Sequence, residues 1–357
     1  MARAELVVDR LVATGFIRPS VLWRGLQHSR PSFSHWGVGL LIGLSGLLVE
    51  PLAWLQSLLY AQRLRRVQLP DDPIVIIGHW RSGTTYLHQL LACDPVVATA
   101  RNTLTMAPQV ALLLQPWIAP LMKAWMTRVR PIDAVPWGPD DPQEDEVGLA
   151  RLTFDTNMGG MAFPRDYLAN FRRHVLETST AYERQWLTFC RLTWLHDGAG
   201  KSHWLIKNSV HTARVRLVLK HFPRARFVLL RRSPVDSIRS LVQVKQRLGA
   251  LVGMQPLPDP PTQVEETATA HRELLEAFEA SRHLIPAQQL LVLDYDDLIS
   301  QPLQAVEGIY THFDLTSWPV AEAPIKARID RARSYTADPV QLPPLAERRL
   351  QELVKAS

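Results

Sequence analysis

The stretch VIIGHWRSGTT, from Val75 to Thr85, constrains the fold of this chain more than any other. A short apolar run ends at Gly78, and a polar turn between Gly78 and Gly83 leads into a helical pattern. The glycine spacing is that of the phosphate loop GxxxxGKS or GxxxxGKT, but Thr84 stands where that loop has lysine. The backbone N–H groups of such a turn and the positive end of the following helix dipole suffice to hold an anion. The stretch therefore predicts a strand, an anion-binding loop and a helix, with Arg81 supplying the missing charge.

Four short apolar runs have the length and composition of buried strands. They lie at Ile74–Ile77, His203–Ile206, Arg226–Leu230 and Leu290–Leu293. A turn and a helical pattern follow each run, as expected for a parallel sheet covered by helices on both faces. Ligands bind at the carboxyl ends of the strands in such a sheet. The sequence therefore predicts an α/β fold with a central parallel sheet flanked by helices, whose polar motifs meet at one edge.

The chain divides into two parts at the punctuating sequence PDDP, Pro70–Pro73. Residues 1–70 are predicted to form an N-terminal helical segment, and residues 71–357 the main domain. Within the main domain, residues 101–200 are rich in Trp, Met, Phe and Pro. We expect that region to form helices and long loops that make a lid or an acceptor pocket.

Residues 36–60 are the most apolar part of the chain. The run from Trp36 to Val49 is apolar or small, but Glu50 ends it after about 14 residues, whereas spanning a bilayer takes about 20. Three interpretations stay open: a helical hairpin packed on the domain, a surface that contacts membrane or a lipid-like substrate, and a transmembrane helix.

Charge and cysteine content narrow the partners and the compartment. The formal net charge of +6 and the pI near 9.5 favour anionic partners. The arginines cluster near phosphate-loop-like turns and form no long basic run, so we expect a nucleotide and not a nucleic acid. Cys93 and Cys190 lack disulfide or zinc spacing, and the N-terminus lacks the uninterrupted apolar core of a signal peptide. The sequence therefore predicts a cytoplasmic protein, and it leaves open whether that protein also associates with a membrane.

A second strand-turn-helix unit, RFVLLRRSPVDSIRSL, follows about 150 residues after the first. Ser233 is predicted to be the N-cap of its helix, and Pro234 suits the first helical position. Ser237 and Ser240 lie one turn apart on one face, so a hydroxyl there and the guanidinium of Arg232 could converge on one phosphate. Together the two loops predict a nucleotide that bears two separate phosphate groups.

With these motifs the chain resembles the sulfotransferases that use 3′-phosphoadenosine 5′-phosphosulfate, and among them the bacterial group whose loop reads G-x-x-RSGTT. The resemblance extends over PIVIIGHWRSGTTYLHQLLACDP, PQEDE, KNSVHTARVRLVLKHFPRARFVLLRRSPVDSIRS and LDYDDLISQP, between Pro73 and Pro302. It implies a P-loop-like sulfotransferase fold and in-line transfer of a sulfuryl group to a hydroxyl acceptor, with no metal required.

The resemblance also implies which residues bind the donor. The residues that would hold the 5′-phosphosulfate are Arg81, Ser82, Gly83, Thr84 and Thr85. Arg232 and Ser240, eight residues apart as in the family, would hold the 3′-phosphate. The missing lysine is then understandable, because this donor has no γ-phosphate. A positive charge placed beside the bridging oxygen and the leaving phosphate is enough to stabilise the negative charge that they gain. Arg81 is the candidate for that catalytic charge.

Two residues are candidates for the general base that takes the proton of the acceptor hydroxyl. Glu144 lies in PQEDE, an acidic cluster that resembles one common in the bacterial group, and His211 lies at a predicted helix start in LIKNSVHTAR. Lys207 is expected to contact the leaving group or a sulfuryl oxygen. The spacing Lys-x-x-x-His differs from the Lys-x-His of one branch of the family, so both candidates stay open.

Two other functions compete with sulfuryl transfer. A P-loop kinase or NTPase would need the absent lysine and a magnesium-binding aspartate, which only LLVLD imitates. A non-catalytic nucleotide-binding protein could use residues 36–60 as a membrane anchor. For a transferase, the aromatic and methionine residues between Trp117 and Tyr167 favour a small-molecule acceptor with a hydrophobic or lipid-like hydroxyl over a free sugar.

Ligand preference separates these functions. We expect isothermal titration calorimetry to show binding of 3′,5′-bisphosphoadenosine in preference to ATP, because the two loops match two phosphates at opposite ends of a ribose. Preference for ATP, or no binding of either nucleotide, would contradict the sulfotransferase interpretation.

Overall fold

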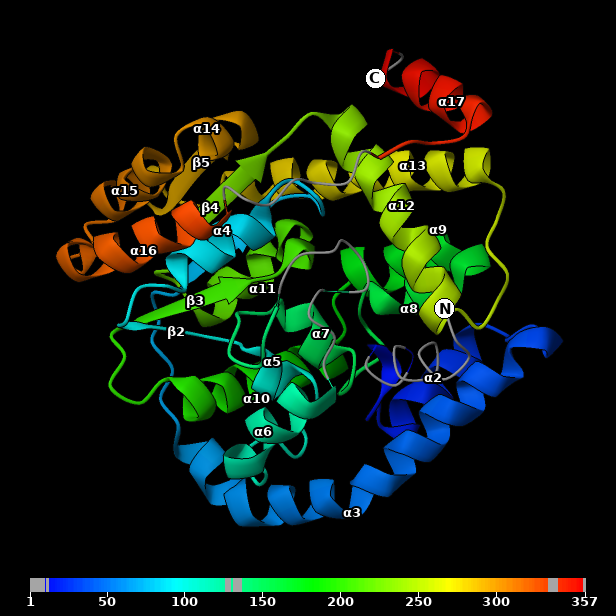
Figure 1. Ribbon diagram of the computed structural model, residues 1–357, viewed down its shortest axis with the longest axis horizontal. Helices are drawn as coiled ribbons and strands as arrows, with labels where there is room; N and C mark the ends of the chain where they lie inside the picture. The colour runs from blue at the N-terminus through cyan, green and yellow to red at the C-terminus, as the bar shows by residue number, and fades with distance from the viewer. Residues whose placement is uncertain (1–9, 11–12, 126–129, 131–136, 333–339, 356–357) are drawn as a thin grey trace.

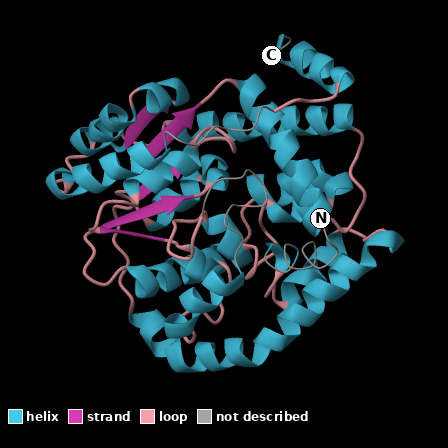
Figure 2. Cartoon of the chain, viewed as in Figure 1, coloured by secondary structure: helices cyan, strands magenta, loops and turns pink. Residues whose placement is uncertain are grey.

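In the described part of the chain, five parallel strands form one sheet at the centre of the fold (Figures 1 and 2). The computed structural model describes residues 10, 13–125, 130, 137–332 and 340–355. The strands are β1 (Ile74–Ile77), β2 (Val97–Thr99), β3 (His203–Lys207), β4 (Arg226–Arg231) and β5 (Leu290–Asp294), in the order β2-β3-β1-β4-β5. The four predicted strands are confirmed within one residue. The sequence analysis missed β2, because three residues are too few to show a period.

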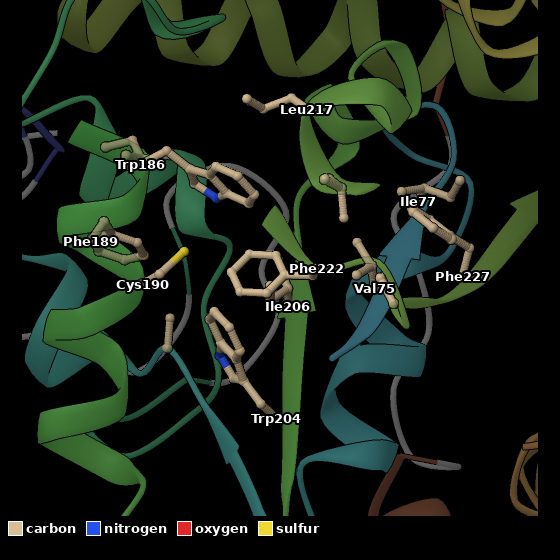
Figure 3. Packing of buried hydrophobic residues seen from close by; sticks show 14 of the residues in the cluster. Val75, Ile77, Trp186, Phe189, Cys190, Trp204, Ile206, Leu217, Phe222 and Phe227 are labelled. Carbon is tan, nitrogen blue, oxygen red and sulfur yellow. The ribbon is translucent and has the colours of Figure 1, made fainter. Parts of the chain in front are cut away.

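Helices cover both faces of the sheet, as predicted, because successive residues of a strand point to opposite sides. Val75 and Ile77 belong to a core with α10 (Thr180–Asp197) and α11 (Val215–His221). Figure 3 shows this core, with Trp186 of α10 directed toward the strands. Ile74 and Ile76 pack on the opposite face. The helices there are α4 (Thr84–Leu91), α15 (Pro302–His312) and α16 (Trp318–Ala332).

The strand register brings three loops to one edge of the sheet. In β1, Ile76 pairs with Lys207 of β3, and Ile77 pairs with Leu229 of β4. Since all three strands are parallel, the chain leaves each of them at the same edge. The polar motifs that follow β1, β3 and β4 therefore lie side by side there.

The remaining described helices surround this framework. They are α5 (Asn102–Thr105), α6 (Gln115–Trp125), α7 (Asp145–Leu149), α8 (Met158–Ala162), α9 (Tyr167–Phe171), α12 (Pro234–Val252), α13 (Pro260–Arg282), α14 (Tyr295–Ser300) and α17 (Pro344–Lys355). Short 3₁₀ segments lie at Pro164–Asp166, Ser209–Ala213 and Ala287–Gln289, and a π-helical turn at Arg172–Leu176. Parts of the predicted lid region, residues 126–129 and 131–136, lie outside the described residues.

The N-terminal part is helical, as predicted for residues 1–70, in the portion that the structure describes. It contains α2 (Pro19–His28), a 3₁₀ turn at Phe33–His35 and the long helix α3 (Trp36–Arg66). No hairpin forms at Glu50-Pro51, because α3 continues through Pro51 as one helix of 31 residues. By length and composition alone, the segment Phe33–Arg66 is long and apolar enough to cross a membrane. In Figure 1, α3 runs along one side of the molecule and curves around it.

The core beneath the sheet should dominate stability. Phe189 is fully buried in the core that includes Val75 and Ile206, so Phe189→Ala is expected to lower the free energy of unfolding by about 3–5 kcal/mol through lost burial and a new cavity. Chemical denaturation followed by circular dichroism measures this. The exposed Leu345→Ala on α17 is the control, with a change within about 0.5 kcal/mol. Equal changes in the two variants would contradict this assignment of the core.

Candidate functional site

The loop between β1 and α4 takes a backbone conformation that depends on its two glycines. Gly78 has φ +135° and Gly83 has φ +94°, which side-chain-bearing residues rarely adopt. A Cβ on Gly78 would lie 2.4 Å from the carbonyl oxygen of Leu230, and one on Gly83 would lie 2.6 Å from the ring of Tyr295. The predicted tight turn is therefore present, and Leu230 of β4 and Tyr295 at the start of α14 leave no room for side chains at these positions.

Hydrogen bonds hold this loop in place and leave the start of α4 open. The amide of Gly78 donates to Thr212 Oγ1 at 2.8 Å, and Ser82 Oγ donates to the carbonyl oxygen of His79 at 2.7 Å. Gly83 is the N-cap of α4, and among the described residues no side chain forms a capping hydrogen bond with that helix. The first backbone N–H groups of a helix have no partner within the helix. The N-terminus of α4, at Thr84 and Thr85, is therefore suited to an anion.

The two predicted phosphate loops touch each other through Arg81. Arg81 has a left-handed backbone, with φ +69°, and its Nε donates to Ser240 Oγ at 2.9 Å. Arg232 Nη1 donates to the carbonyl oxygen of Arg81 at 2.8 Å. The Arg232 guanidinium also lies over the ring of Tyr295, 4.2 Å from its centroid. Arg81 therefore forms one basic cluster with Arg232 and Ser240, which follow it by more than 150 residues in the sequence.

The helix that carries Ser240 begins as predicted, except for its cap. Pro234 is the first residue of α12 and Ser233 its N-cap, but the Ser233 side chain makes no capping hydrogen bond. Ser237 lies one turn before Ser240 and is buried, and its hydroxyl has no hydrogen-bond partner among the described residues. A buried hydroxyl without a partner is uncommon, and it suits a site that a ligand completes.

Glu144 and Lys207 form an ion pair at the end of β3, next to the loop after β1. Lys207 Nζ donates to Glu144 Oε2 at 2.5 Å, and the amide of Ser209 donates to Glu144 Oε1 at 3.0 Å. Lys207 is buried, whereas 15% of the Glu144 side chain is exposed. The pair therefore presents a carboxylate at the sheet edge, with its orientation fixed by two donors.

The other two carboxyl groups of the PQEDE cluster face inward. Glu146 is fully buried, and its carboxylate accepts from the amide of Asn157 at 2.6 Å and from Asn208 Nδ2 at 3.1 Å. Burial raises the pKa of Glu146 to about 7, and burial and the two neighbouring glutamates raise the pKa of Asp145 well above its usual value. Glu144 alone of the three is placed to meet a ligand. Within the described ranges, no group of three or more His, Cys, Asp or Glu side chains could hold a metal ion.

His211, the other candidate base, lies in the core and not at the sheet edge. Its ring is fully buried and packs edge-on against Trp186, with 5.0 Å between the ring centroids. Neither ring nitrogen has a hydrogen-bond partner in the part of the chain that the structure describes. Burial and the nearby Arg214 lower the pKa of His211 to about 3. The geometry therefore favours Glu144 over His211 as the group that could reach a substrate.

Comparison with known proteins identifies the family. The sequence pattern of the family described as "Sulfotransferase family" matches residues 73–319, about two thirds of the chain. The chain belongs to the sulfotransferase family. This assignment confirms the resemblance seen in the two phosphate motifs and makes the protein an enzyme that transfers a sulfuryl group. The kinase and the non-catalytic alternatives are set aside.

Several mycobacterial proteins are similar to this sulfotransferase. The omega-hydroxy-beta-dihydromenaquinone-9 sulfotransferases Stf3 of Mycobacterium bovis and Mycobacterium tuberculosis are each 24% identical over 311 residues, covering 85% of this chain and 77% of theirs. Among crystal structures, sulfotransferase STF9 from Mycobacterium avium superposes with a TM-score of 0.66 at 17% identity, covering 94% of both chains. Sulfotransferase STF1 from Mycobacterium tuberculosis gives 0.64 at 18% identity over 99% of both. These structures confirm the predicted fold.

Two residues of the site were missing from the sequence analysis. Thr212 fixes the first loop residue, and Tyr295 lies between Gly83 and Arg232. Thr212 follows His211 directly, so it lies in a segment that the sequence analysis had singled out. Tyr295 belongs to the DYDD stretch after β5, where no motif distinguishes it from an ordinary helix start.

The neighbouring arginines Arg231 and Arg232 allow a matched test of the basic cluster. Arg232→Ala is expected to weaken binding of 3′,5′-bisphosphoadenosine by about 10- to 100-fold, because a hydrogen bond to a charged group is worth about 1.5–3 kcal/mol. Arg231→Ala is the control, since Arg231 is exposed and pairs with Asp294. Calorimetric titration measures both variants, and equal losses of affinity would remove the special role of Arg232.

Proposed function

We propose that this sulfotransferase transfers the sulfuryl group of 3′-phosphoadenosine 5′-phosphosulfate to the hydroxyl group of a hydrophobic, lipid-like acceptor. The observation that carries the proposal is the contact between the two phosphate loops through Arg81. One anion at the start of α4 and a second at Arg232 fit a donor with two separate phosphate groups.

The donor would lie along the edge formed by β1 and β4. Its 5′-phosphosulfate would accept from the N–H groups at Gly83, Thr84 and Thr85, with the Ser82 and Arg81 side chains beside it. Its 3′-phosphate would accept from Arg232 and Ser240, and the unpartnered hydroxyl of Ser237 is one turn away. Donors held this rigidly stabilise developing negative charge without reorganising during the reaction.

Glu144 would act as the general base. The acceptor oxygen attacks sulfur, its proton passes to the Glu144 carboxylate, and the bond from sulfur to the 5′-phosphate oxygen breaks. The leaving nucleotide keeps the electron pair, and the positive charge of Arg81 compensates it. Lys207 orients Glu144 and brings a second cation to the sulfuryl oxygens.

The acceptor proposal rests on the relatives and on the surroundings of Glu144. Stf3 is named for a hydroxylated dihydromenaquinone, which is a lipid-like alcohol. In this chain, α5 packs against α7, the helix that begins after Glu144. An apolar cluster lies at the end of α5 and includes Met106 and Met122. We therefore propose a cytoplasmic enzyme that meets its acceptor at a membrane surface.

A charge-removing substitution tests the base. Glu144→Gln is expected to lower kcat by about 100-fold or more with binding of 3′,5′-bisphosphoadenosine retained, because the amide cannot accept the proton. Turnover can be followed as release of 3′,5′-bisphosphoadenosine with a long-chain alcohol as acceptor. Asp140→Asn, a few residues upstream and exposed, is the control and should keep full turnover.

His211→Ala is expected to behave differently. Loss of a buried ring should lower the free energy of unfolding by about 1–3 kcal/mol, while turnover per folded molecule is retained. Full turnover in Glu144→Gln would place the base elsewhere, and a loss of turnover confined to His211→Ala would reverse the assignment.

A further inference from the structure

The outward face of α3 is apolar over most of its length. From Trp36 to Leu59 its exposed positions are leucines, two tryptophans and a proline, with only Gly37 and Ser57 as exceptions, and no charged residue. Leu48 is 80% exposed and Trp54 is 69% exposed. A helix on the surface of a soluble protein normally carries its charged residues on this side. An apolar surface of this extent indicates an interaction site.

The inward face of α3 is held on the protein by polar and small residues. Gln56 Nε2 donates to the carbonyl oxygen of Pro108, and Gln56 Oε1 accepts from the amide of Leu112 at 2.8 Å. Ser45 and Gly46 are buried on the same side. These contacts fix the rotation of α3 about its axis. The exposed leucines between Trp36 and Leu59, here called the leucine stripe, therefore face away from the protein.

The single acidic residue of α3 is neutralised. Glu50 is half-buried and forms an ion pair with Arg18, which precedes α2. The negative charge of Glu50, which lies beside the leucine stripe, is therefore compensated by Arg18. A helix crossing a bilayer would have lipid around it, whereas α3 uses the side with Glu50 and Gln56 to bind the protein. The arrangement suits a helix that lies in the plane of a membrane surface.

Aromatic side chains extend the apolar surface onto the neighbouring elements. Phe33, just before α3, is 95% exposed, and Trp23 of α2 is also exposed. Trp117 and Leu121 are exposed on α6, and Leu114, just before α6, packs against Val49 and Ala53 of α3. Tryptophan is enriched where membrane proteins meet the headgroup region of a bilayer.

The charge around the stripe favours an anionic partner. Residues 10–70 contain seven arginines and one acidic residue, Glu50. Three of the arginines, Arg63, Arg65 and Arg66, are exposed at the C-terminal end of α3, just beyond the leucine stripe. Clusters of arginine beside an apolar face bind the anionic headgroups of a membrane.

We propose that the outward face of α3 docks flat on an anionic membrane, with the stripe from Trp36 to Leu59 buried at the acyl boundary and Arg63, Arg65 and Arg66 at the lipid phosphates. The curved course of α3 makes this face convex (Figure 1). Fluid lipid conforms to a convex face along its whole length, whereas a second copy of the same face would touch it only over a short stretch. Docking does not depend on sulfuryl transfer, but it would bring a lipid-like acceptor to the enzyme.

Vesicle flotation of the full chain, without donor or acceptor, tests the docking. We expect binding to vesicles of phosphatidylcholine with phosphatidylglycerol, and weaker binding to phosphatidylcholine alone. The double variant Leu47→Glu/Leu58→Glu should lose at least about tenfold in affinity, because each lost leucine removes several buried CH₂ groups. Both leucines are exposed, so folding should be unaffected, and circular dichroism checks this. Leu345→Glu on α17, away from α3 in Figure 1, is the matched control and should bind as the parent does.

Three further outcomes decide between membrane docking and its competitors. Replacing Arg63, Arg65 and Arg66 by glutamine should abolish the preference for anionic vesicles, and an unchanged preference would contradict the proposed orientation. Resistance of cell-membrane-bound protein to extraction by alkaline carbonate would show a spanning helix and overturn the proposal. Absence of vesicle binding, together with a dimer in light scattering that Leu47→Glu/Leu58→Glu dissociates, would assign the face to a second copy. Bisphosphoadenosine binding by the double variant shows separately that the donor site is intact.

Discussion

The contact that Arg81 makes with the loop after β4 organises the candidate donor site. Its backbone takes a left-handed conformation, which is unfavourable for arginine and persists only when the surroundings hold it. Two hydrogen bonds hold it: Arg232 donates to the Arg81 carbonyl oxygen, and Arg81 Nε donates to Ser240 of α12. Both loops are adjacent because β1 and β4 are parallel neighbours in register. The geometry of the candidate donor site therefore depends on the sheet beneath it.

Burial assigns different roles to three consecutive acidic residues. α7 begins at Asp145, so the chain turns there and directs Glu144 outward while Asp145 and Glu146 enter the protein. Inside, the protonated form of a carboxyl group is favoured, and the pKa of Glu146 rises to about 7. Glu144 lies at the edge of the site, where Lys207 and the amide of Ser209 bind its carboxylate.

A short packed path connects the α3 surface with Glu144. Gln56 of α3 binds the backbone at Leu112, and residues 107–112 follow α5 directly. Asn102 of α5 accepts a hydrogen bond from Gln143, whose side chain in turn accepts from the amide of Glu144. A helix that rests on a membrane would thus be anchored to the segment that positions the proposed base. This arrangement suits an acceptor that is drawn from the membrane.

The sequence by itself determined the strands β1, β3, β4 and β5, the glycine loop, the second loop with Arg232 and Ser240, and the helical N-terminal part. These features are local: a strand shows as a run of apolar residues, and a glycine turn shows as the spacing between glycines.

Only the tertiary structure decided which side chains share the candidate site. The ring of His211 is in the core while its neighbour Thr212 binds the loop, and Tyr295 reaches Arg232 from the start of α14 with no motif of its own. Likewise, the apolar content of residues 36–60 was plain from the sequence. Hydropathy does not tell, however, how α3 is rotated about its own axis, and therefore which of its side chains face the protein. The contacts of Gln56 and Glu50 with the rest of the protein set that rotation, and so decided that the leucines of α3 face outward.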